Sequence, residues 1–351
     1  MASANAPPGR RRSSGWKRSL AIAASLAIAV GLLVGVLPAI ADIGEVWRAI
    51  RTLTWLESSS LLALAAWNIA TYQLVIMSAL PGLTIGRAFV VGQISTAVSN
   101  TLPAGSAVGV GITYAMFSSF GFDAGSIAIA SVVTGLWNTF VKLGLPIVAL
   151  VILSFRGQGN AALQSAAITG LAILVAAVGA LGLTLARESF ARAIGERIGK
   201  LVSTVARRFR RGPFEGWGER LAVFRSQSID LLRRRWHWVT LASVVSHLSL
   251  FSMLLLALRH MGVSAESVTG PEALAAFAVV RLLTALPITP GGLGVVEVGY
   301  TTALVLAGGD EELVVAAVLI YRALSYLLQV PLGVIAWAIW RSRSDWRTAS
   351  P

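Results

Sequence analysis

The sequence predicts an all-α polytopic membrane protein, with about six full transmembrane helices and two broken re-entrant hairpins in an inverted repeat. Hydrophobic residues make up 56% of the 351 residues and charged residues only 13%, a balance typical of membrane proteins rather than water-soluble ones. Six apolar stretches are each long enough to cross roughly 30 Å of hydrocarbon as a helix. Two further apolar regions contain prolines and glycines that interrupt a straight helix.

The six expected spans are residues 20–40, 60–80, 127–155, 161–186, 236–258 and 313–340. The first also resembles a secretory signal, because arginines precede it and the small-residue sequence Ala39-Ile40-Ala41 stands at its end. Its apolar run is longer than a signal core, which favours an uncleaved helix. The interrupted regions are residues 88–120 and 273–307, and each is either a helix pair or a re-entrant hairpin.

Positive charge indicates how the chain is oriented. Of the 29 lysines and arginines, 21 lie in three segments: before the first expected span, between Arg187 and Arg235, and after the last span. Because positive loops stay on the cytoplasmic side, we expect a bacterial inner-membrane protein with both termini in the cytoplasm. The domains are then a basic N-terminus (1–19), one transmembrane domain (20–340) and a cytoplasmic tail (341–351).

The basic segment 187–235 is expected to contain an amphipathic helix on the anionic inner leaflet and a second short helix from Trp217 to Leu232. A docking surface for a lipid-supplying enzyme is the alternative. Nucleic acid is not an expected partner, since no soluble module is visible. The absence of cysteine excludes disulfides and thiolate metal sites, and we expect no cofactor.

An internal repeat links the two interrupted regions. Asn100-Thr101-Leu102-Pro103-Ala104-Gly105 in the first resembles Pro290-Gly291-Gly292-Leu293-Gly294 in the second, and the order helix, broken pair, helix recurs in residues 59–153 and 236–340. The expected topology makes the two broken pairs enter from opposite faces. Inverted repeats of this kind place helix breaks at a shared site near the bilayer midplane.

The candidate substrate site lies around the second break. Arg281 is deep in an apolar segment and needs a carboxylate, a phosphate or water; its nearest expected partner is Glu297, with Arg322 as a third member. Two interpretations remain open: the arginines hold a lipid phosphate beside the backbone of Gly291 and Gly292, or the charges form a structural ion pair. The full set is Arg281, Pro290, Gly291, Gly292, Glu297 and Arg322, with Asn100, Pro103 and Gly105 from the first repeat.

Lone polar residues elsewhere have simpler interpretations. Lys142 is expected to pair with Asp123 or to extend toward an interface. His237 and His247 lack partnering carboxylates and predict no zinc site.

The run from Leu286 to Glu297, with Arg281 before it and Tyr321-Arg322 after it, resembles the signature of the lysylphosphatidylglycerol synthase transmembrane-region family. That family includes the flippase-like membrane domain of the bacterial multiple peptide resistance factor. The resemblance implies a membrane domain that moves an aminoacylated phospholipid, which a separate soluble domain makes. The chain ends soon after its last span, so we expect a stand-alone relative without that domain. Ala107-Val108-Gly109 departs from the Gly-Glu pair that the family pattern has near the first break.

The leading functional hypothesis is therefore a flippase-like protein that translocates a phospholipid or lipid-linked headgroup, with anionic phospholipid headgroups as its partners. The alternative is a non-transporting membrane partner in cell-envelope lipid or glycan assembly, together with an envelope-biosynthesis enzyme. An intramembrane enzyme ranks lowest, because no Ser/His/Asp set, carboxylate pair or metal cluster occurs at a workable spacing. The sequence has no nucleotide-binding Gly-Lys-Ser/Thr loop, so ATP is not the expected energy source.

Overall fold

The computed structural model describes residues 48, 51–102, 105–155, 161–186, 189, 217–284, 290–343 and 346. Helices make up most of these ranges, turns and bends connect them, and the ranges contain no strand. The expected span at residues 20–40 and most of the basic segment lie outside them. Four helices in the described ranges are long and apolar enough to cross a membrane. They are Trp55–Ala79, Ala124–Phe155, Val223–His260 and Glu311–Ser342.

The first half of the described chain has one long helix, two short ones and two more long ones. These are α3 (Trp55–Ala79), α4 (Ile85–Thr101), α5 (Gly105–Ser119), α6 (Ala124–Phe155) and α7 (Ala161–Ala186). The second half repeats the order of long helix, short pair and long helix. Its elements are α9 (Trp217–His260), α10 (Gly270–Leu283), the 3-10 turn η2 (Pro290–Gly292), α11 (Val295–Leu306), α12 (Glu311–Arg322), the π-helical turn η3 (Ala323–Leu327) and α13 (Gln329–Ser342).

Helix ends follow from local capping chemistry. Thr54 before α3 and Thr269 before α10 each form a capping box with the glutamate three residues later, which satisfies two backbone donors that the first helical turn leaves free. Asp310 accepts a hydrogen bond from the backbone of Leu313 and so caps α12.

The prediction of a separate short helix at residues 217–232 is wrong. These residues form the start of α9, because no proline or internal glycine interrupts the sequence that follows Gly218.

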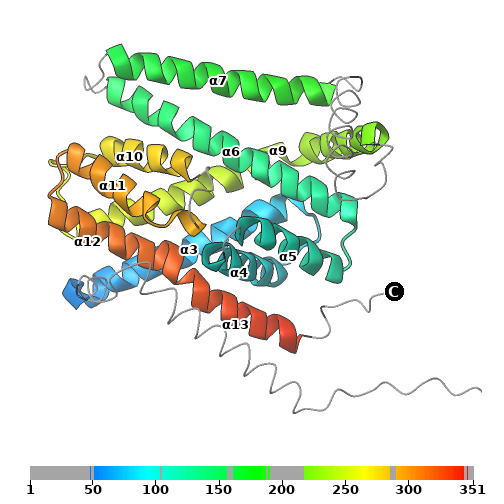
Figure 1. Ribbon diagram of the computed structural model, residues 1–351, viewed down its shortest axis with the longest axis horizontal. Helices are drawn as coiled ribbons and strands as arrows, with labels where there is room; N and C mark the ends of the chain where they lie inside the picture. The colour runs from blue at the N-terminus through cyan, green and yellow to red at the C-terminus, as the bar shows by residue number, and fades with distance from the viewer. Residues whose placement is uncertain are drawn as a thin grey trace, which may run out of the picture.

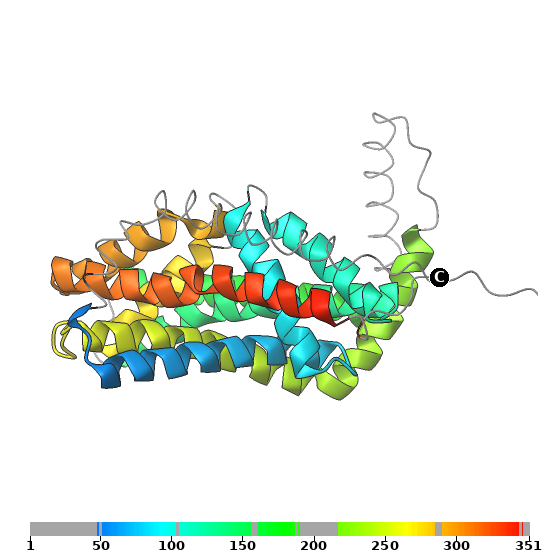
Figure 2. The ribbon, with the colours of Figure 1, turned by 90° about the horizontal axis from the view of Figure 1, so that it is seen from below.

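The four long helices run side by side, and the short pairs lie between them toward opposite ends (Figure 1). Each short pair packs against the long helix of the other half: α4 lies on α13, and α10 lies on α6. Helices α3 and α9 pack on each other, whereas α7 lies at the edge against α6. Figure 2 shows α12, η3 and α13 as one continuous rod that spans the molecule.

Two apolar cores lie toward the two ends of this bundle. One joins α10, α11 and α12 to the second half of α9, and the other joins α4, α5 and the start of α6 to α13. Four expected spans are confirmed as helices of membrane-spanning length. A fifth, α7, matches its expected bounds, and its described apolar stretch is Ile168–Leu183. The count of six spans and the re-entrant course of the short pairs stay predictions.

Candidate functional site

The second helix break is built from glycines in left-handed backbone conformations. Gly291, Gly292 and Gly294 have φ angles of 59°, 73° and 74°, values that side-chain-bearing residues rarely adopt. A Cβ atom on Gly291 would also overlap the ring of Tyr326. The Pro290–Gly292 turn therefore depends on glycine both for its backbone conformation and for the close approach of the next long helix.

An ion pair between a buried arginine and a partly buried glutamate closes this break. Arg322, at the end of α12, donates through Nε to Glu297 Oε1 at 2.5 Å and through Nη2 to the carbonyl oxygen of Gly291 at 3.3 Å. Its guanidinium also lies 4.4 Å from the centre of the Tyr326 ring, a favourable cation–π arrangement. Arg322 thus joins α11, η2 and η3.

The expected pairing of Glu297 with Arg281 is wrong. Glu297 lies in the first turn of α11, which packs against α12, and it meets Arg322 there. Arg281 lies on the part of α10 that faces the other long helices, within electrostatic reach of Tyr72 on α3, Lys142 on α6 and His247 on α9. The break between α10 and α11 turns the two residues toward different neighbours.

The two helix breaks meet each other in space. The end of α4 packs against η2, and the Tyr326 hydroxyl donates a hydrogen bond of 2.6 Å to the carbonyl oxygen of Asn100. Tyr326 therefore touches both breaks. Gly105 begins α5 and lies against the carbonyl oxygens of Val98 and Ser99. Pro103, the other expected residue of the first break, lies outside the described residues.

Tyr326 was not predicted from the sequence, although it comes one helical turn after Arg322. It belongs to η3, where the long helix widens into a π-helical turn. Such turns insert an extra residue into an α-helix and recur at functional sites. Here the turn directs Tyr326 toward the breaks, while Ser325 of the same turn lines a cavity.

This cavity lies between the two halves and has a volume of about 460 Å³. Both halves contribute to its walls, through α3, α4, α5, α6, α9, α10, η3 and α13. Its lining is rich in hydroxyl, amide and other polar side chains, including Asn68, Tyr72, Gln73, Gln93, Ser95, Thr96, Ser131, Thr134, Asn138, Ser243, Ser246, His247, Arg281, Ser325 and Gln329.

Several of these polar groups lack hydrogen-bond partners. Within the described part of the chain, six buried side-chain nitrogen or oxygen atoms of residues that line this cavity have no hydrogen-bond partner among protein atoms: Gln73 Oε1, Gln93 Oε1, Ser243 Oγ, His247 Nε2, Arg281 Nε and Ser325 Oγ. Two of their residues, Gln73 and Ser243, are each only 1% exposed. Because a buried polar group without a partner costs about 1–3 kcal/mol, this cluster indicates a space filled by water or ligand.

Unpaired positive charge adjoins the same cavity. Neither Arg281 nor Lys142 has an ion-pair partner among the described residues. The expected partner of Lys142, Asp123, instead accepts a hydrogen bond from the backbone of Ser126 at the start of α6. Lys142 comes nineteen positions after Asp123, which is about 28 Å along a helix. Lys142 lies within electrostatic reach of Arg281 and His247 instead.

The polar groups that line the cavity also lie at a similar depth along the candidate membrane spans. Asn68 on α3, Asn138 on α6, Ser243 on α9 and Ser325 on η3 each lie near the middle of a candidate span. Polar and charged groups at this depth are expensive in hydrocarbon and mark substrate or ion pathways. No group of three or more metal-ligating side chains occurs in the described ranges. The geometry suits binding of an anion that also offers hydrogen-bond donors.

The family model described as Lysylphosphatidylglycerol synthase TM region matches residues 22–333 of the chain. This match covers both breaks, the ion pair and every residue that lines the cavity. No curated protein matches the sequence.

Proposed function

Because the chain belongs to the lysylphosphatidylglycerol synthase transmembrane-region family, we propose that it moves the headgroup of an anionic phospholipid between leaflets through the central cavity. One observation supports this proposal above all others. Arg281, a cation without a carboxylate partner among the described residues, adjoins a polar cavity that both halves of the protein build near the middle of four candidate spans.

The charge around the cavity favours a phosphate group. Arg281 and Lys142 bring two positive charges close together, and Glu297 is already engaged by Arg322. A phosphodiester supplies the missing anion and accepts charge-assisted hydrogen bonds, the strongest kind that a guanidinium makes. The family resemblance agrees, since its larger members act on a phospholipid.

The remaining wall atoms favour a headgroup with donor hydrogens. His247 Nδ1 lies 2.9 Å from the carbonyl oxygen of Ser243, which only accepts, so Nδ1 carries the hydrogen and Nε2 of the neutral ring is an acceptor. Gln73 Oε1 and Gln93 Oε1 are further acceptors without partners among the described residues. A glycerol-type headgroup offers hydroxyl hydrogens to such atoms, whereas a quaternary ammonium headgroup offers none.

The test is lipid flux in proteoliposomes that contain fluorescent phosphatidylglycerol. Arg281→Gln is expected to slow transfer between leaflets about 10- to 100-fold, the loss of one hydrogen bond to a charged group. Arg281→Lys should keep part of the rate because it keeps the charge. Arg341→Gln, far along α13 from the cavity, is the matched control and should transfer lipid like the unaltered protein.

Two results would contradict the proposal. Folded unaltered protein that moves lipid no faster than protein-free vesicles would favour the non-transporting partner in envelope assembly. Equal transfer rates for Arg281→Gln and the unaltered protein would remove Arg281 from the site.

A further inference from the structure

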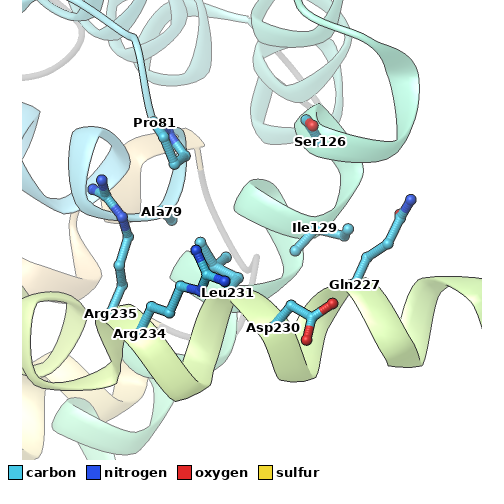
Figure 3. Close-up of a pocket in the computed structure, with 9 residues that line it drawn as sticks. All are labelled: Ala79, Pro81, Ser126, Ile129, Gln227, Asp230, Leu231, Arg234 and Arg235. Atoms are coloured by element: carbon cyan, nitrogen blue, oxygen red, sulfur yellow. The ribbon is translucent and has the colours of Figure 1, made fainter.

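A second pocket lies at one end of the bundle, away from the central cavity. Its volume is about 490 Å³, and residues from the end of α3, the start of α6 and the early part of α9 line it (Figure 3). The lining comprises Ala79, Pro81, Ser126, Ile129, Gln227, Asp230, Leu231, Arg234 and Arg235. Apolar and charged side chains thus face the same space.

Positive charge dominates one end of this pocket. Figure 3 shows Arg234 and Arg235 together near Ala79 and Pro81, whereas Asp230 and Gln227 lie at the opposite end. Within the described ranges neither arginine has an ion-pair partner. Two guanidinium groups that are free to bind, next to an apolar wall, match the border between a lipid phosphate and its acyl chains.

Aromatic residues indicate the depth of the pocket. Trp236 and Trp238 follow the two arginines on α9, and each is 56% exposed. Exposed tryptophans next to arginines are typical of the membrane–water interface. The strongly apolar part of α9 begins at this point. The pocket therefore has the depth of phospholipid headgroups, in the leaflet that the basic segment is predicted to face.

The same three helices lead from this pocket to the central cavity. On α6, Ile129 lines the pocket and Ser131 lines the cavity; on α3, Ala79 lines the pocket and Ile76 the cavity. On α9, Ser243 comes eight positions after Arg235, a distance of about 12 Å along the helix. A headgroup bound at the arginines would have only two helical turns to travel.

We propose that the pocket is a loading site, in which Arg234 and Arg235 bind the phosphate of an anionic phospholipid from the adjacent leaflet. Lipid binding to this pocket does not depend on transport. Delivery of the bound headgroup to the central cavity, by contrast, rests on the proposed function. The apolar wall from Ala79, Pro81, Ile129 and Leu231 favours a lipid over a free phosphate ion.

The experiment measures lipid binding to the purified full chain by native mass spectrometry, with phosphatidylglycerol and phosphatidylcholine as probes. It uses the Arg281→Gln background, so that retained phosphatidylglycerol reports the pocket rather than the central cavity. Adding Arg234→Gln and Arg235→Gln is expected to weaken phosphatidylglycerol binding at least about tenfold. Arg233→Gln is the matched control, because this exposed arginine is on the same helix but does not line the pocket.

Each outcome decides the loading site separately from transport. Preferential phosphatidylglycerol binding that the double substitution removes and Arg233→Gln keeps supports the pocket, even where flux measurements fail. The proposal is overturned if Arg281→Gln alone abolishes the binding, if the double variant binds normally, or if Arg233→Gln causes the same loss. Displacement of the lipid by millimolar inorganic phosphate would also overturn it, because the pocket would then recognise the ion and not the lipid.

Discussion

In α4–α5, glycines let two helices approach closely, whereas a partly buried ion pair ties α10–α11 to its neighbours. A Cβ atom on Gly105 would lie 2.6 Å from the carbonyl oxygen of Val98, and one on Gly109 would overlap the Ser99 hydroxyl. Ser95 donates to the carbonyl oxygen of Gly109 at 3.0 Å. Described side chains of the first pair contribute no ion pair at its break.

The second pair occupies the equivalent position in its half but depends on charge. Glu297 and Arg322 hold α11 to α12, and Arg281 of α10 lies by the cavity. The close contacts between glycine and serine at the first break contain no charged group whose partner a phosphate could replace. An ion pair can exchange partners with a phosphate. The difference at the breaks is that close packing of small groups holds the first pair, whereas charge holds the second.

Breaking the ion pair is the strongest test of this comparison. Glu297→Ala leaves the Arg322 charge largely buried without its carboxylate, which is expected to destabilise the protein by about 3–5 kcal/mol. Thermal unfolding in detergent should show a large drop in melting temperature. Replacing both partners together, Glu297→Leu with Arg322→Met, should recover much of the loss. An unchanged melting temperature for Glu297→Ala would show that the second pair does not depend on its charge.

Crowding the first pair is the next test. Gly105→Val forces a side chain against the backbone of α4, and such overpacking costs about 1–3 kcal/mol. Gly111→Val, the same substitution in the same helix, is the control, because a Cβ atom there meets nothing within 4 Å. Equal melting temperatures for the two variants would contradict close packing at Gly105.

Removing the hydrogen bond that links the two pairs should have the smallest effect on stability. Tyr326→Phe removes the hydroxyl that donates to Asn100 but keeps the ring beside Arg322, so a loss of about 0.5–1.5 kcal/mol is expected. Tyr114→Phe, on an exposed part of α5, controls for loss of a hydroxyl elsewhere. A loss for Tyr326→Phe as large as that for Glu297→Ala would mean that the two breaks form one cooperative unit.

The long helices and the breaks were predictable because their signals are local. A run of apolar residues fixes the length of a span, and the glycines around Pro290 both interrupt a helix and adopt positive φ. The contacts between helices were harder to predict from the sequence. Glu297 is closer in sequence to Arg281 than to Arg322, yet the direction of α11 decides the pairing.

The cavity was predicted only in part, because its walls are assembled from small polar residues spread over eight elements. Lys142 illustrates the difficulty: alone in an apolar helix, its sequence context favoured an interface or Asp123. Only the packing of α10 on α6 brings Arg281 near it. The sequence does carry a signal that the prediction did not use: a polar residue near the middle of each of several long spans, such as Asn68, Asn138 and His247.

The packing of α4 on α13 also imposes an order in time. Gly333 of α13 lies so close to Ala97 of α4 that a Cβ atom would overlap it. In a chain synthesised at about 5–20 residues per second, α13 emerges on the order of tens of seconds after α4. During that interval the α4 surface has no permanent partner and must be covered by lipid or by the insertion machinery. Helix α13 therefore completes the assembly of the first broken pair, and maturation of that pair in the cell is delayed until α13 has been synthesised.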